Sequence, residues 1–200
     1  MTSQRHIPPQ ASDSPVGAGS DALLVAAREC VMDVGFKRTT LADVARRAGV
    51  SRMTVYRQYG DLASIVSALL AHELLALIAQ VRLNVANLPT ARERLVEAAV
   101  AAVEALVVHP LYRRVLDLDP ELLLPLVVDR FGSTQRASID LLAEQVAEGQ
   151  RDGSIRRVDA QLAATCLQLT TQSFVFSARV VERVDVSAEL RRLLDSYLRP

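Results

Sequence analysis

The chain has 200 residues, of which half are hydrophobic and 4% aromatic, and its basic and acidic residues balance to a formal net charge of zero. Ala, Leu and Val are abundant while Gly and Pro are scarce, a composition that favours helices and argues against a β-sandwich or barrel. The zero net charge conceals an asymmetry, because residues 1–60 carry eight Lys or Arg against five acids. A basic N-terminal unit on an acidic remainder is compatible with phosphate binding at one end.

The sequence also limits where the protein works and what it binds. Cys30 and Cys166 form no metal-ligand pattern, so no metal or cofactor is expected. Each cysteine is read as a small buried side chain, with redox sensing as the alternative. Residues 1–20 lack the apolar core of a secretory signal peptide, and the apolar stretch 62–79 is interrupted by polar residues. We expect a soluble, cytoplasmic protein that does not enter a membrane.

The first 60 residues predict a disordered arm followed by three helices. Residues 1–20 are polar and rich in Pro, Ser and Gly, which is typical of disorder. From Asp21, apolar residues recur at three- and four-residue spacing until Gly35 ends the helix. Thr40 is the predicted N-cap of a second helix that stops at Gly49, and Ser51 that of a third helix running to about residue 58.

The rest of the chain predicts more helices and no convincing strand. A fourth helix over residues 61–87 is apolar almost all round in its first five turns, which indicates burial between other elements. Thr90 and Glu93 form a capping box for a fifth helix, 91–108. Short helices are expected up to residue 129, and longer ones over 131–149, 159–184 and 187–198, the last capped by Ser187. The sequence therefore predicts an all-α fold of about nine helices.

Residues 41–60, LADVARRAGVSRMTVYRQYG, have the spacing of a helix-turn-helix. Ala45 supplies the small residue where the helices cross, Gly49 tolerates positive φ in the turn, and Val55 anchors the second helix. Val44, Ala48 and Val50 are expected to complete the small core. The outward side chains of the second helix would then face the DNA major groove: Arg52, Met53, Thr54, Tyr56 and Arg57. Spacing alone leaves open an ordinary helical hairpin with a glycine turn.

A longer segment, AARECVMDVGFKRTTLADVARRAGVSRMTVYRQYGDLASIV, resembles the N-terminal domain of TetR-family repressors. The landmarks in register are Ala26-Ala27, Gly35-Phe36, Thr39-Thr40, Asp43-Val44-Ala45, Ala48-Gly49-Val50-Ser51, Thr54-Val55-Tyr56 and Tyr59. The resemblance implies a helix-turn-helix DNA-binding domain at 21–60 and a helical ligand-binding and dimerisation domain at 61–200. Residues 61–200 share with the family only their all-helical character and not a specific sequence motif.

Carried over by position, the resemblance implies individual DNA contacts. Thr40 and Tyr56 would touch phosphates, and Ser51 would cap its helix and could donate to a phosphate. Arg52, Met53 and Thr54 would face the groove, with Arg52 the best candidate for bidentate guanine recognition. Arg57 could be directed at a base or at a phosphate. Leu62 departs from the family, since many members have a phosphate-binding lysine at that position.

The resemblance also implies a homodimer formed by the last two helices. Each of these helices carries an apolar stripe, made of Leu162, Cys166, Leu169, Ser173 and Phe176 on one and of Leu190, Leu193, Leu194 and Tyr197 on the other. Paired with a symmetry mate, the stripes would form a four-helix bundle. The alternative is that they pack on their own body.

The expected function is sequence-specific transcriptional regulation through a double-stranded DNA operator. A repressor released from a palindromic operator by a small, largely apolar effector fits best, with candidate effector contacts at His72, His109, Tyr112, Phe131, Gln172 and Phe174. The main alternative is a helical regulator without an effector, either a constitutive DNA binder or a protein-interaction module. Activation instead of repression also stays open. An enzyme is not expected, because the sequence has no phosphate-binding glycine loop, His-Glu-x-x-His helix or Gly-x-Ser-x-Gly turn.

Overall fold

The computed structural model describes residues 16–119, 132–178, 181 and 186–200. Within these ranges it contains nine helices and no strand, which confirms the predicted all-α fold. The helices are α1 (Val16–Val34), α2 (Leu41–Arg47), α3 (Arg52–Tyr59), α4 (Leu62–Val85), α5 (Ala91–Val108), α6 (Pro110–Leu118), α8 (Ser133–Arg151), α9 (Ala160–Ser177) and α10 (Val186–Leu198).

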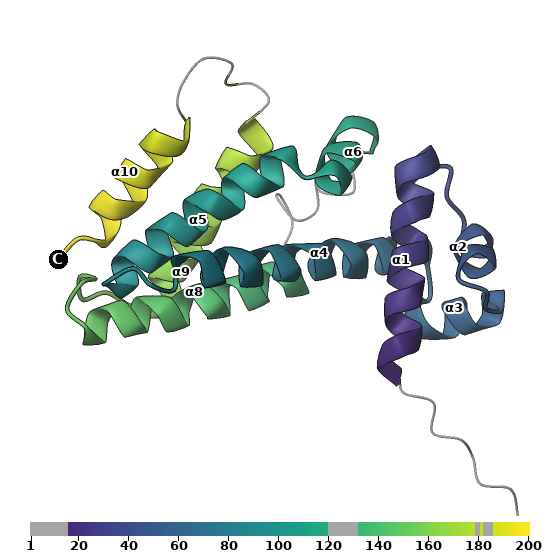
Figure 1. Ribbon diagram of the computed structural model, residues 1–200, viewed down its shortest axis with the longest axis horizontal. Coiled ribbons are helices and arrows are strands. Elements are labelled where there is room, and N and C mark those ends of the chain that lie inside the picture. Colours follow the sequence, from purple (N-terminus) through teal and green to yellow (C-terminus); the bar gives the residue numbers. More distant parts are fainter. Residues whose placement is uncertain (1–15, 120–131, 179–180, 182–185) are drawn as a thin grey trace, which may run out of the picture.

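The long helix α4 connects two parts of the molecule (Figure 1). Helices α1, α2 and α3 gather at one end of α4, and we call them the head. Helices α5, α8, α9 and α10 form the body, in which α5 packs against α4, α8 packs on α9, and α10 packs on α5 on the side away from α4. Helix α6 lies at the junction, where it contacts both α1 and α5.

Helix starts follow the local capping rules that the sequence predicts. Thr40 and Thr90 each form a full capping box, with Asp43 and Glu93 at the third helical position. The Ser51 side chain accepts a hydrogen bond from the Thr54 N–H at 3.1 Å. These caps involve residues three positions apart, so their partners can be predicted from the local sequence.

Three helix ends differ from the prediction. Helix α1 begins at Val16, five residues before the predicted start, while residues 1–15 of the predicted arm lie outside the described part. Extending an existing helix adds one hydrogen bond per residue, which offsets the cost of its two glycines. Helix α9 ends at Ser177 and not near residue 184, and α10 begins at Val186, so Ser187 is not its N-cap. Helices α9 and α10 both pack against α5, so they are two separate helices of the body.

Two hydrophobic cores hold the molecule together. The first contains residues of the head together with Ile65, Leu69 and Leu70 of α4 and Leu111 and Val115 of α6. The second joins α5, α8, α9 and α10. The first core therefore crosses the predicted domain boundary at residue 60, and the head shares its packing with the start of α4 and with α6.

Helix α4 is the one described helix that is long and apolar enough to cross a membrane by length and composition. The sequence predicted burial of α4 between other elements, but 17% of its most apolar window is buried, and Leu75 and Leu83 are 40% and 71% exposed. Helix α4 packs against α1 and α5 on part of its surface, so this prediction is wrong for the rest of the helix. One face of α4 also lines the cavity described below. The same helix thus takes part in the head core and in the body.

Candidate nucleic-acid interface and body cavity

The turn between α2 and α3 is a Schellman motif built on Gly49. Gly49 has φ of 68°, its N–H donates to the Arg46 carbonyl at 3.3 Å, and the Val50 N–H donates to the Ala45 carbonyl at 3.0 Å. A residue with a side chain is strained at this φ, so the turn depends on glycine. The motif ends α2 and directs the chain into α3.

The small core behind the turn holds the two helices at a fixed angle. Val44 and Val55 are fully buried and Ala45 is 3% exposed, which agrees with the predicted crossing. Val50, by contrast, is 36% exposed and does not complete this core. Its place directly after the turn glycine directs it outward, so the sequence prediction for Val50 is wrong.

Helix α3 presents an exposed face beyond this core. Arg52 and Arg57 are exposed, and Met53 and Tyr56 are 71% and 60% exposed to solvent. Thr54 is half-buried, and its hydroxyl shares a 2.8 Å hydrogen bond with Ser51 Oγ. The exposed side chains thus include all the predicted groove-facing residues except Thr54, whose hydroxyl takes part in the helix cap.

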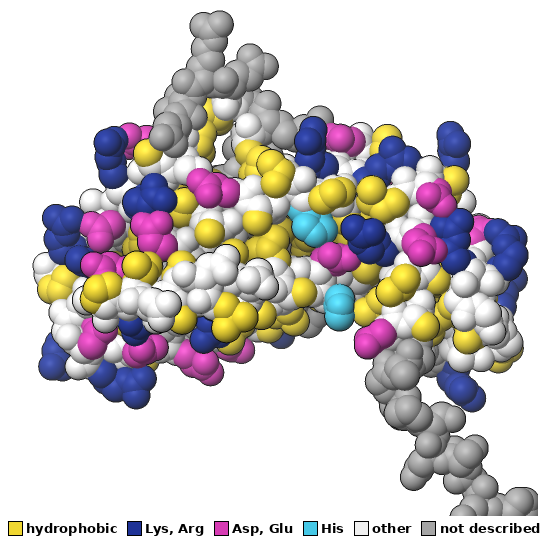
Figure 2. Space-filling view, in the orientation of Figure 1, with side chains coloured by type: hydrophobic (Ala, Val, Ile, Leu, Met, Phe, Trp, Pro, Cys, Tyr) yellow, Lys and Arg dark blue, Asp and Glu magenta, His cyan; other side chains and the backbone are white. Residues whose placement is uncertain are grey.

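The charges of the head are not all available to a polyanion. Arg46 pairs with Asp43 at 2.7 Å and Arg47 pairs with Asp33 at 2.7 Å. Within the described ranges, Arg52 and Arg57 have no acidic side chain at ion-pairing distance. On the face shown in Figure 2, basic side chains surround this end of the molecule with acidic ones among them. The free cations of the head therefore include the two arginines of α3.

Thr40 begins α2 at the exposed edge of the head, as predicted. Its hydroxyl donates to Asp43 Oδ2 at 2.6 Å, and this bond and the Thr40 N–H hold the pKa of Asp43 below its usual value. The hydroxyl is already engaged within the capping box. A phosphate at this site would therefore meet the threonine beside an ionised carboxylate.

Polar links join the head to the body at the α6 junction. Arg28 of α1 pairs with Glu73 of α4 at 3.0 Å, and the other oxygen of Glu73 lies 3.3 Å from His109 Nε2. The Phe36 N–H donates to the buried carboxylate of Asp119 at 2.9 Å. These contacts connect the helix-turn-helix to α4 and α6, and their partners are too far apart in the chain to be predicted from local sequence.

The body contains a cavity of about 620 Å³ between α4, α5, α8 and α9. Its α4 and α5 walls are mainly apolar, with Leu70, Leu74 and Ile78 on α4. Tyr112 of α6 also lines it and donates to the Leu70 carbonyl at 2.8 Å. Burial raises the pKa of Tyr112 well above its usual range, so its phenol stays neutral. A cavity of this volume is within the range of small-molecule sites.

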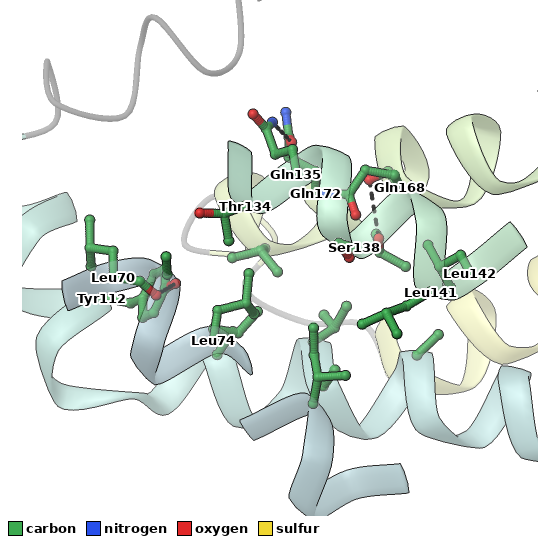
Figure 3. A pocket seen from close by; sticks show the side chains of 18 of the residues that line it. Leu70, Leu74, Tyr112, Thr134, Gln135, Ser138, Leu141, Leu142, Gln168 and Gln172 are labelled. Carbon is green, nitrogen blue, oxygen red and sulfur yellow. Dashed lines mark hydrogen bonds between the residues drawn. The ribbon is translucent and has the colours of Figure 1, made fainter. Parts of the chain in front are cut away.

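The structure places two of the six predicted effector contacts, Tyr112 and Gln172, at the cavity (Figure 3). His72 is exposed on α4, and His109 contacts Glu73 and the edge of the Tyr112 ring without lining the cavity. Phe174 packs against the second core, because it points to the other side of α9 from Gln172. Phe131 lies outside the described residues.

The sequence prediction missed several polar residues of the cavity. They come from α8 and α9 and are Thr134, Gln135, Ser138, Gln145, Gln168 and Thr171. Gln168 and Gln172 are four positions apart in α9, a spacing that places both on one face of the helix. That spacing was the available signal, although it cannot show which helix the face meets.

The predicted dimer stripes divide between exposed and buried positions. Leu162, Leu169 and Ser173 of α9 are exposed, and Leu193 of α10 is 47% exposed. Leu190 and Leu194 are at most 1% exposed in the second core, so they pack on their own body and cannot form an interface. Phe176 lines the cavity instead of the outer face. Cys166 and Tyr197 are half-buried, and burial and a hydrogen bond with Cys166 raise the pKa of Tyr197.

The cysteines are separate features of the fold. Cys30 is 5% exposed in the first core, where burial raises the pKa of its thiol, as expected for a small buried side chain. Cys166 is on the body helix α9, and both thiols are free. Across the described ranges, no group of three potential metal ligands comes together.

Comparisons with known proteins agree with this architecture. Residues 23–69 match the model of the bacterial regulatory proteins of the tetR family. An uncharacterised HTH-type transcriptional regulator of Mycobacterium bovis is 38% identical over 180 residues, covering 88% of this chain and 92% of the relative. The TetR-family repressor QsdR of R. erythropolis superposes with a TM-score of 0.73 at 14% identity, over 92% of this chain and 96% of QsdR.

A second solved structure shares the fold. The regulator FadR of Bacillus subtilis, in complex with stearoyl-CoA, has a TM-score of 0.60 at 20% identity, over 89% of this chain and 98% of FadR. The helix-turn-helix, the helical body and the match over most of a curated relative all lead to one conclusion. This chain belongs to the TetR family and is a DNA-binding transcriptional regulator, not an enzyme.

Proposed function

We propose that this regulator is a cytoplasmic homodimer that represses transcription from a palindromic operator and is released by a small, largely apolar effector. The observation that carries the proposal is the body cavity, because α4 forms one wall of it and also contributes Ile65 and Leu69 to the head core. A molecule that enters the cavity therefore meets the helix that holds the head.

Two routes can carry a change from the cavity to the head. One is α4 itself, with its Arg28–Glu73 ion pair. The other is α6, which has Tyr112 at the cavity and is followed directly by Asp119 at the Phe36 N–H. An effector shifts the equilibrium only if it binds one arrangement of these helices more tightly than the other. An effector that displaces Tyr112 from the Leu70 carbonyl meets this requirement.

The proposed DNA contacts belong to one surface of the head. Thr40 and Tyr56 would contact phosphates, and Ser51 would be a further hydrogen-bond donor to a phosphate. Arg52, Met53 and Thr54 would face the bases in the major groove. Arg57 would contact either a base or a phosphate. A single helix-turn-helix makes few contacts, so two heads must act together on half-sites about 34 Å apart. Exposed leucines of α9 and α10, namely Leu162, Leu169 and Leu193, are the proposed pairing surface.

An apolar effector is supported by the chemistry of the cavity walls. The α4 and α5 walls offer mainly Leu, Val, Ile and Ala side chains, which favour burial of apolar surface. The FadR structure with stearoyl-CoA shows that this fold can hold a ligand with a long apolar chain. That observation concerns FadR, and the proposal for this chain rests on its own cavity.

Selection of bound sequences from a random duplex library tests the DNA half of the proposal, with Arg52→Ala as the control variant. We expect a two-fold palindrome that is lost or relaxed in the variant. If no sequence is enriched at low salt, the DNA-binding proposal fails, and the alternative function as a protein-interaction module takes its place. The selected duplex then serves to test release by apolar compounds, measured as fluorescence anisotropy. An operator complex that no cavity-binding compound weakens would indicate a constitutive DNA binder.

A further inference from the structure

The cavity has one polar side and almost no charge. Helices α8 and α9 contribute amides and hydroxyls to it: Thr134, Gln135, Ser138, Gln145, Gln168, Thr171 and Gln172. Figure 3 shows several of these side chains across from Leu74 of α4. Among the described residues that line the cavity there is no acidic or histidine side chain, and Arg82 is the one charged group. The cavity thus has an apolar wall facing an uncharged hydrogen-bonding wall.

One pair of amides has a defined arrangement on that wall. Gln135 is 7% exposed, its Oε1 accepts from the Gly132 N–H at 2.8 Å, and its Nε2 donates to Gln172 Oε1. Because the Gln172 oxygen already accepts this bond, the NH₂ group of Gln172 is the part of the side chain that remains to donate to a ligand. The first bond fixes Gln135, and Gln135 in turn orients Gln172.

We propose that the effector carries an uncharged, hydrogen-bond-accepting head group, such as a carboxamide, ester, ketone or alcohol, on an apolar body. The head group accepts a hydrogen bond from Gln172 while the apolar part lies against α4 and α5. The cavity therefore selects against carboxylates of the same chain length. This inference rests on the proposed effector function and adds the chemical class of the effector.

The reason is the cost of burying a charge. An ionised carboxylate that leaves water for a site without a cation loses its hydration, and neutral amide donors replace only part of it. Arg82 is exposed on α4 and lies two turns beyond Leu74, a distance of about 12 Å along the helix. Among the described residues that line the cavity, a carboxylate next to Gln172 therefore has no cation beside it, whereas a neutral acceptor has a suitable donor.

Three probes of known chemistry test the head group on the full-length protein. The fluorescent N-phenyl-1-naphthylamine reports occupancy of the cavity, and decanamide and sodium decanoate compete for it at about pH 8, where decanoate is ionised. We expect decanamide to bind at least about tenfold more tightly than decanoate. Gln172→Leu is expected to weaken decanamide binding about three- to tenfold, as for one lost hydrogen bond. Its affinity for the naphthylamine should stay within about twofold, and Gln80→Leu, on the exposed face of α4, should change neither.

The outcomes separate this inference from the function on which it rests. Equal or tighter binding of decanoate overturns the inference and leaves an apolar-effector repressor in place. In that case, loss of decanoate binding in Arg82→Gln would assign an anionic head group to the other end of the cavity. Unchanged decanamide binding in Gln172→Leu also overturns it, because Gln172 then makes no bond to the head group. Failure of all three probes to bind overturns the effector function as well.

Discussion

The guanidinium of Arg28 and the carboxylate of Glu73 meet at 3.0 Å and join the first helix of the head to the helix that lines the cavity. The second oxygen of Glu73 lies 3.3 Å from His109, at the start of α6. Three helices thus share one carboxylate at the junction. Because both ionic side chains are partly exposed, the pair contributes little to overall stability, but it restrains the angle between head and body.

Glu73→Gln is expected to weaken operator binding about three- to tenfold by releasing that restraint in each subunit of the dimer. The measurement is fluorescence anisotropy with the selected operator at constant salt. Glu97→Gln is the matched control, since Glu97 pairs with Arg191 at 2.7 Å within the body at similar exposure. Equal losses in the two variants would show that the Arg28–Glu73 pair has no special part in positioning the head.

Asp119→Ala should destabilise the protein by about 1–3 kcal/mol, because it leaves the Phe36 N–H without its acceptor at a part-buried site. The free energy of unfolding in urea measures this loss. Asp119→Asn keeps an acceptor oxygen, so it should lower the free energy of unfolding clearly less than Asp119→Ala does. If the two variants are destabilised equally, the hydrogen bond to the Phe36 N–H is not the source of the stability that Asp119 contributes.

Arg52→Ala is expected to cost at least about tenfold in operator affinity and to relax the preference at one base of each half-site, as for loss of a bidentate guanine contact. Anisotropy with single-base operator variants measures both effects. Arg38→Ala removes an exposed positive charge of the head outside α3, so any loss of affinity that it causes should be the same for all operator variants. A uniform loss in Arg52→Ala would instead assign Arg52 to a phosphate.

Leu169→Glu is expected to convert the dimer to a monomer, because the charge would be buried in the proposed α9 surface without a partner. Analytical ultracentrifugation measures the change. Leu83→Glu introduces the same charge at an α4 leucine that is 71% exposed and should leave the dimer intact. A dimeric Leu169→Glu protein would mean that the subunits pair elsewhere.

Asp152 gives a pH-dependent prediction. Hydrogen bonds from the Ser154 side chain and from the Ala91 N–H, the latter at 2.8 Å, lower the pKa of Asp152 in the folded protein. Its stabilising contribution is therefore fully present above the unfolded pKa of about 4 and is lost as the pH falls through the lower folded value.

Asp152→Asn should reduce the free energy of unfolding by up to about 1 kcal/mol near neutral pH. This difference between the variant and the wild-type protein should become smaller below about pH 4. Urea denaturation across this pH range provides the measurement. Asp140→Asn, at an exposed aspartate within α8, the helix that Asp152 follows as C-cap, is the control and should show a smaller, nearly constant effect. A gap for Asp152→Asn that widens as the pH falls would contradict the assigned direction of the pKa shift.

The helix starts and the helix-turn-helix could be predicted because they depend on residues close together in the chain. Thr40 with Asp43, Ser51 with Thr54 and the turn at Gly49 are complete within a few positions. Val50 is the exception, since hydrophobicity predicted burial and the direction of the chain after the turn decided exposure. The partners of these local hydrogen bonds are adjacent in the chain, so the sequence alone could predict them.

The apolar stripes show what the sequence left open. Periodicity identifies an apolar face of α10, but a face can pack against its own chain or against a partner, and only the position of α5 decided that Leu190 and Leu194 are internal. The cavity wall is a similar case, because Gln135 and Gln172 are 37 residues apart and meet only when α8 packs on α9. The sequence by itself determined the helices and the DNA-reading motif, while tertiary packing, which sets contacts between distant residues, decided the cavity and the links from it to the head.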